Sequence, residues 1–175
     1  EKNEASITYN ELREIIEMPL NHLGLQLSYH DLADGLPSAS EMKKYRAVII
    51  WTKTNYSTHA MAFWPWLDQQ LTAGRRVVLI DELGPVVGPN ATFVPLKTIN
   101  AVLSHMGLSY YVGGDVFSPD IEVVYKNSEM VEFERKIGHE LRELPSVQSI
   151  RPNNKVYLSL QQGSTKRLSD PVVIT

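Results

Sequence analysis

Two apolar segments with a helical pattern between them constrain the fold of this chain more than any other feature. "RAVIIWT" (46–52) and "RRVVLID" (75–81) are almost continuously apolar, which is typical of central parallel strands covered by helices on both faces. Between them, "HAMAFWPWLDQQLTAG" (59–74) is helical in pattern and ends at Gly74. A parallel strand pair joined by a helix is therefore the predicted centre of the molecule.

Further elements continue the alternation of helices and strands. We expect helices over 8–23, 41–45 and 95–108, and parallel strands over 25–30 and 109–112. Pro19 makes the first helix kink or stop. The predicted fold class is α/β, a three-layer, doubly wound, mostly parallel sheet. Because such a sheet normally begins with a strand, we expect another strand before Glu1.

The character of the sequence changes after Asp115. Short extended segments are expected over 121–127, 147–152, 155–163 and 171–175, with one helix over 129–142. We predict a single α/β domain over 1–175, with an α/β layer (1–115) and a β-rich extension (116–175). "PVVIT" (171–175) ends in mid-strand, so we expect the chain to be a fragment of a larger multidomain protein.

Composition and charge exclude several classes of function. The 175 residues carry a formal net charge of −3 and a pI near 6.0, so we expect no binding of nucleic acid. No apolar run approaches the roughly 20 residues of a membrane helix, so no membrane insertion is expected. The chain has no cysteine and its five histidines lack metal-ligand spacing, so no metal is expected. No glycine loop for a phosphate is present, so no cofactor is expected either.

A polar turn follows the second apolar strand. Asp81 and Glu82 come directly after it, at the end of the strand where ligands of open α/β sheets bind. A nucleophile elbow would need Ser or Cys at this turn, whereas Leu83 occupies it. We therefore assign no catalytic residue. If a small-molecule site exists, its predicted ligand-binding residues are Thr52, Lys53, Asn55, Asp81, Glu82 and Asp115.

Aromatic residues near the first strand offer a second kind of site. Trp51 and Tyr56 lie among amide and hydroxyl side chains, and such surfaces suit the stacking of sugar rings. For the aromatic residues of the next helix, packing in the core is favoured over sugar stacking. These are Phe63, Trp64 and Trp66.

Several phrases together resemble a known family. They are "EIIEMPLNHLGLQLSYHDL", "KYRAVIIWTKTNYS", "PWLDQQLTAGRRVVLIDELG" and "VYLSLQQGSTKRLSDPVVIT". They are similar to the middle region of the PelA family, multidomain periplasmic proteins of Pel exopolysaccharide biosynthesis in biofilms. The resemblance implies a flavodoxin-like or class I glutamine amidotransferase-like fold and a periplasmic location. In that family, other domains carry glycoside hydrolase and deacetylase activities.

Three hypotheses of function follow. The first is a non-catalytic scaffold or docking domain whose partners are other domains of the same polypeptide, since active amidotransferase-like domains need a cysteine that this turn lacks. The second is a polysaccharide-binding module that uses Trp51 and Tyr56. The third is a cryptic hydrolase that uses Glu82, or a reductase.

Overall fold

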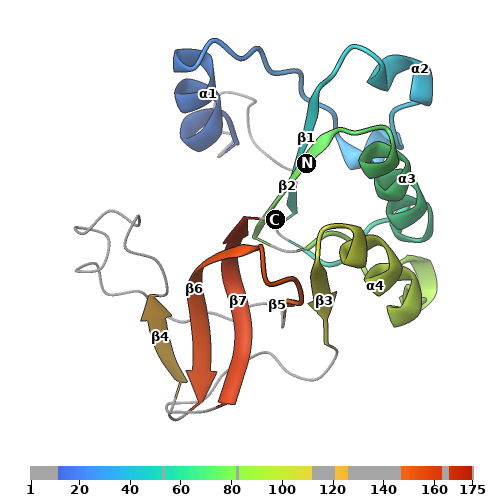
Figure 1. Cartoon of the computed structure of the whole chain (residues 1–175). Coiled ribbons are helices and arrows are strands. Elements are labelled where there is room, and N and C mark those ends of the chain that lie inside the picture. Colours follow the sequence, from blue (N-terminus) through green and yellow to red (C-terminus); the bar gives the residue numbers. More distant parts are fainter. Residues whose placement is uncertain are drawn as a thin grey trace.

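The chain forms a mixed α/β structure of helices and small sheets (Figure 1). The computed structural model describes residues 12–52, 54–81, 83–111, 121–125, 147–162 and 166–174. Strands β1 (Ala47–Thr52) and β2 (Arg76–Asp81) pair in parallel, with Ile50 opposite Leu79. Helix α3 (Ala60–Thr72) connects them. The predicted strand–helix–strand centre is therefore confirmed.

The hydrophobic core lies between this strand pair and two helices. Helix α4 (Leu96–His105) packs beside α3, and both contribute side chains to one buried cluster with β1. Phe63 and Trp64 have no solvent exposure, and their rings meet edge to face with centroids 5.5 Å apart. Trp66 packs against the same cluster while partly exposed. The prediction that the aromatic residues of this helix pack in the core is confirmed.

The remaining strands form two antiparallel sheets. Strand β3 (Leu108–Tyr110) pairs with β5 (Val147–Ser149). Strand β6 (Lys155–Gln162) lies between its neighbours β4 (Ile121–Tyr125) and β7 (Lys166–Ile174). Strands β4 to β7 lie within the segment predicted to form the β-rich extension. Pro171 lies within β7, at the edge of its sheet, where a missing N–H is tolerated. The helix predicted over 129–142 lies outside the described residues.

The expected parallel strand over 109–112 is wrong in its pairing. The strand exists over 108–110, but its partner is the antiparallel β5. The Asn100 side chain of α4 accepts from the Tyr110 N–H at 2.7 Å and donates to the Tyr110 carbonyl at 2.9 Å. Because Asn100 occupies these backbone groups, Tyr110 cannot offer them to a neighbouring parallel strand.

The strand predicted over 25–30 is also wrong. This segment is extended but joins no sheet in the described structure. The alternation in "LQLSYH" is real, yet a strand requires a hydrogen-bonded neighbour as well as a pattern. The segment instead connects α1 (Met18–His22) to a short 3₁₀ turn, η3 (Leu32–Asp34).

The two predicted N-terminal helices are partly confirmed. The first is described as a π-helical turn, η2 (Leu12–Glu17), followed by α1, and Pro19 lies at the junction, where its missing N–H favours wider turns. Helix α2 (Ala39–Met42) begins earlier than the predicted 41–45. It does so because Ser38 and Glu41 form a capping box, in which each side chain bonds the other residue's backbone N–H.

The predicted three-layer, doubly wound sheet is not confirmed. The core cluster joins the described helices α3 and α4 to one face of the β1–β2 pair. On the opposite face, the side chain of Val78 is 44% exposed, and α1 buries none of its residues. The described part of the chain has no helix with the length and apolar character needed to cross a membrane.

Candidate functional site

The ends of β1 and β2, where the sequence predicts a site, are covered by the turn that follows β2. We call residues 83–88 the strand-end turn. Leu83, Gly84 and Pro85 are buried, and Trp64 donates its indole N–H to the Pro85 carbonyl at 2.9 Å. Gly84 has φ +132°, and a Cβ placed there would lie 2.7 Å from Phe63 Cε1. The turn is therefore packed directly onto α3.

Backbone hydrogen bonds fix the strand-end turn from both sides. The Asn55 carbonyl accepts from the N–H groups of Val86 and Val87 at 2.7 and 2.9 Å. The Val87 carbonyl accepts from the Ser57 N–H at 2.9 Å, and the Val86 carbonyl accepts from the Val94 N–H at 2.8 Å. These bonds satisfy the backbone groups that a bound anion would otherwise use.

The predicted ligand-binding residues have different placements. Thr52 and Asp81 end β1 and β2 and lie opposite each other in the ladder, while Asn55 is exposed beside the turn. The Thr52 hydroxyl is buried and has no hydrogen-bond partner in the described structure. Lys53, Glu82 and Asp115 lie outside the described residues. Binding of a small molecule by this set stays a prediction.

The two predicted sugar-stacking residues differ in their exposure to solvent. Trp51 is half-buried in β1, whereas the side chain of Tyr56 is 48% exposed. Val87 forms β-bridges with Tyr56 on one side and with Phe93 on the other. Phe93 is 68% exposed, so two accessible aromatic residues flank Val87. Sequence reasoning missed Phe93, which is brought to Tyr56 only by these bridges.

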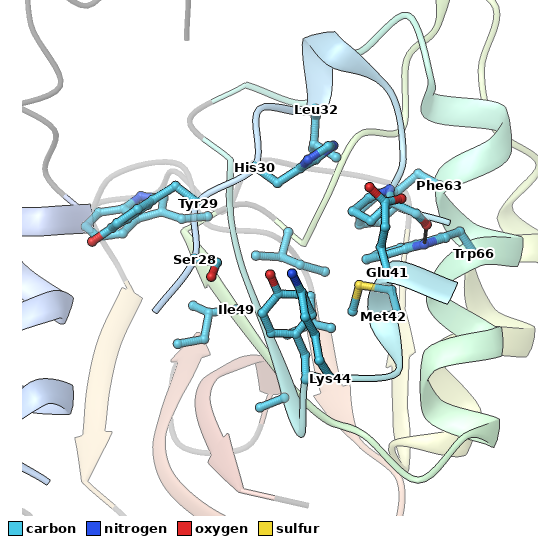
Figure 2. Close-up of a pocket in the computed structure, with 16 residues that line it drawn as sticks. Ser28, Tyr29, His30, Leu32, Glu41, Met42, Lys44, Ile49, Phe63 and Trp66 are labelled. Carbon is cyan, nitrogen blue, oxygen red and sulfur yellow. Dashed lines mark hydrogen bonds between the residues drawn. The ribbon is translucent and has the colours of Figure 1, made fainter. Parts of the chain in front are cut away.

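A pocket of about 250 Å³ lies along β1 (Figure 2). Its inner part is formed by the buried Met42, Ile50 and Phe63 and the half-buried Trp66, and β1 contributes every residue from 47 to 51. Its exposed part comes from the 28–45 segment and includes Ser28, Tyr29, His30, Glu41 and Lys44. We call this feature the β1 groove. Sequence reasoning missed it because residues 25–30 were expected to form a strand.

Hydrogen bonds attach the outer wall of the β1 groove to the strand–helix–strand unit. The Trp66 indole N–H donates to the Pro37 carbonyl at 2.9 Å. The Arg75 guanidinium donates to the Met42 carbonyl through Nε at 3.1 Å and Nη2 at 2.8 Å. A wall attached at two points keeps its distance from β1 without a ligand.

The ionisable groups at the exposed rim are already engaged. The Ser38 hydroxyl and backbone N–H donate to Glu41 Oε2 at 2.6 and 2.7 Å, and these bonds lower the pKa of Glu41. Hydrogen bonds with Ser28 and then with Lys44 lower the pKa of Tyr45. The rim thus offers hydrogen bonds and charges of both signs.

The described residues contain no cluster of three or more potential metal ligands. No family model, characterised protein or solved structure matches the chain.

Proposed function

We propose that this chain is a non-catalytic docking domain of a PelA-like exopolysaccharide-modifying protein that acts in the periplasm during biofilm formation. Its partners are other domains of the same polypeptide. The observation that carries the proposal is the strand-end turn, since Leu83, Gly84 and Pro85 fill the position where this class of fold performs chemistry. The β1 groove supplies a separate surface for docking.

The proposal includes the finer fold. The parallel β1–β2 pair is part of a doubly wound, flavodoxin-like or amidotransferase-like sheet. Two observations support this: α3 crosses between parallel strands, and the exposed Val78 marks a sheet face that another layer would bury.

An activity assay tests the absence of catalysis. The purified chain is incubated with polysaccharide, acetylated-sugar and ester substrates, and no turnover above a buffer blank is expected. Turnover that disappears in the Glu82→Gln or Asp81→Asn variant would overturn the proposal. Both substitutions keep the size of the side chain and remove its charge.

Polysaccharide binding is the second candidate, and the exposed pair Tyr56 and Phe93 favours it. Two aromatic faces on neighbouring segments suit stacking on sugar rings. Titration with oligosaccharides, followed by tryptophan fluorescence, tests this candidate. If it holds, the double variant Tyr56→Ala/Phe93→Ala weakens binding at least fivefold, while Tyr111→Ala, which removes a similarly exposed aromatic ring, leaves it unchanged. A titration in which the fluorescence does not change would leave docking as the only one of the two candidate functions.

A further inference from the structure

We infer that the β1 groove is an acceptor site for one extended peptide segment with alternating apolar and neutral polar side chains, which adds to the free edge of β1 as a further strand. The inference rests on the proposed docking function and names the kind of partner that the domain docks. It depends on the backbone of β1, the geometry of the groove and the chemistry of its surfaces.

The backbone of β1 offers a row of free groups. The Arg76 N–H donates to the Arg46 carbonyl at 3.1 Å. Because backbone groups of successive strand residues point to opposite sides, even-numbered residues of β1 face β2, and Ala47, Ile49 and Trp51 face the other edge. In the described part of the chain, no backbone hydrogen bond reaches this second edge. It is therefore a template for strand addition.

The pocket follows this same edge. Side chains of consecutive strand residues point to opposite faces of a sheet. A pocket lined by all of residues 47–51 therefore lies along the edge of the strand and not over one face. On its far side, the extended residues Ser28, Tyr29 and His30 line the groove. Figure 2 shows the groove between them and α3.

The wall of the groove is formed before any partner arrives. The bonds from Trp66 to Pro37 and from Arg75 to Met42 hold the 28–45 segment at both of its attachment points. A preformed groove lowers the ordering cost of binding. Residues 25–30 do not pair with β1 themselves, although they are extended and alternate like a strand.

The surfaces of the groove select the partner. Met42, Ile50, Phe63 and Trp66 form an apolar base that takes every second side chain of an added strand. The rim carries one carboxylate, Glu41, and one ammonium, Lys44, so it favours neither sign of charge. An added strand with apolar side chains on one face and neutral polar ones on the other matches both surfaces.

One buried polar atom at the end of β1 fits the same partner. Trp51 lines the groove, and its Nε1 is buried without a hydrogen-bond partner in the described residues. Leaving such a group unpaired is unfavourable. A carbonyl or hydroxyl oxygen of an added strand would satisfy it. By contrast, the 250 Å³ of the pocket is small for an enclosed ligand, whose sites span roughly 300–1,000 Å³.

Amide hydrogen exchange measured by NMR tests the inference on the full chain. The probe is a capped nine-residue peptide, Lys-Thr-Val-Thr-Val-Thr-Val-Thr-Lys, whose terminal lysines keep it soluble. We expect saturating peptide to slow exchange at Ala47, Ile49 and Trp51 at least tenfold. Exchange at Val48 and Ile50, which already bond β2, changes less than twofold. A peptide with proline at the central valine gives no protection.

Two variants probe the groove independently. Ala47→Pro removes an N–H from the free edge at the first, exposed position of β1, where proline is tolerated. Ser28→Arg fills the groove from its exposed far wall and leaves β1 unchanged. Each of these two variants should weaken binding of the peptide at least tenfold. Ser40→Arg, on the same segment but outside the groove, should leave binding unchanged.

The outcomes separate this inference from the proposed function. No protection at Ala47, Ile49 and Trp51, equal binding by Ser28→Arg and Ser40→Arg, or protection of these amides by an oligosaccharide in place of the peptide would overturn strand addition. None of these results concerns catalysis. Turnover of a substrate would overturn the non-catalytic proposal, whatever the peptide does.

Discussion

The strand-end turn and the β1 groove lie beside the same two strands and differ in how their backbone groups are used. In the turn, Asn55 and Ser57 bond the backbone of Val86 and Val87, and Trp64 bonds Pro85. Along the groove, the second edge of β1 has no backbone partner in the described structure. The turn at which a small-molecule site was predicted only conditionally is held by these bonds, whereas residues 25–30, predicted to form a strand, leave the edge of β1 unpaired in the described structure.

This difference shows why the location of a site in a fold family does not establish a function. A strand-end position becomes a site only where the following turn leaves room for a ligand. Here Gly84 and Pro85 of the following turn are buried. The free edge of β1 has the opposite property, because unpaired backbone groups and an apolar base are both requirements for binding a strand.

The largest expected effect comes from a substitution in the strand-end turn. Gly84→Ala places a Cβ 2.7 Å from Phe63 Cε1, at a residue with φ +132°. Backbone strain and overpacking together should lower the free energy of unfolding by about 2–5 kcal/mol, measured by urea denaturation. The matched control is Gly74→Ala, at φ +76° with nothing within 4 Å of the added Cβ. It should cost only about 1–2 kcal/mol, from backbone strain.

Equal losses in these two glycine variants would break the comparison. They would mean that the turn is not packed on Phe63, and that space for a ligand exists at the ends of the strands.

The second prediction concerns the wall of the β1 groove. Trp66→Phe keeps a ring in the core and removes the donor to the Pro37 carbonyl. We expect a loss of about 1–2 kcal/mol in unfolding free energy and faster amide exchange over residues 38–42. The exposed Tyr111→Phe is the control and should change neither quantity. Unchanged exchange over 38–42 in Trp66→Phe would show that the wall does not depend on this bond.

The central part of the fold could be predicted because its signals are local. Continuous apolar runs and a helical pattern ending at Gly74 predicted β1, α3 and β2 with boundaries within two residues of those observed. The pairing of β3 could not be predicted, since it depends on Asn100 reaching Tyr110 across the end of α4. Such a contact leaves no periodic trace in the sequence.

The candidate sites were harder to predict than the fold. Tyr56, a predicted sugar-stacking residue, is exposed, but its neighbour Phe93 is 37 positions further along the chain and is joined to it through Val87. The β1 groove exists because residues 25–30 do not pair with β1. Their alternating pattern is the same for a paired and an unpaired segment, so the pattern cannot distinguish the two.

The third prediction tests the N-terminus of α2, which carries part of the groove rim. Ser38→Ala removes the cap of a four-residue helix and should cost about 1 kcal/mol in unfolding free energy. The hydrogen bonds from Ser38 lower the pKa of Glu41, so they stabilise the fold above the ordinary value of 4.5, and this contribution is lost as the pH falls below it. The difference in stability between wild type and Ser38→Ala should therefore shrink from pH 7 to pH 3. A constant difference would exclude the role assigned to the Glu41 carboxylate.

The smallest expected effect lies where Tyr29 attaches the outer wall of the groove to η2. Its phenol donates to Glu17 Oε2 at 2.7 Å, and Arg13 Nε lies 2.9 Å from the same oxygen. Partial desolvation, followed by this hydrogen bond, raises the pKa of Tyr29 to about 12, while the Tyr29 hydrogen bond lowers the pKa of Glu17. The Tyr29 contribution to stability is thus complete below pH 10 and is lost as the pH rises toward 12. The Glu17 contribution is present above pH 4.5 and is lost in acid.

Because both groups are accessible to solvent, the effect of this contact on overall stability should be small, and titration is the sharper measurement. The tyrosinate absorbance of wild type minus that of Tyr29→Phe should give a midpoint of about 12. When both proteins also carry Glu17→Gln, the midpoint of this absorbance difference should move toward the ordinary pKa of 10. An unmoved midpoint would mean that Glu17 does not hold this wall, and that the bonds from Trp66 and Arg75 alone keep the groove open.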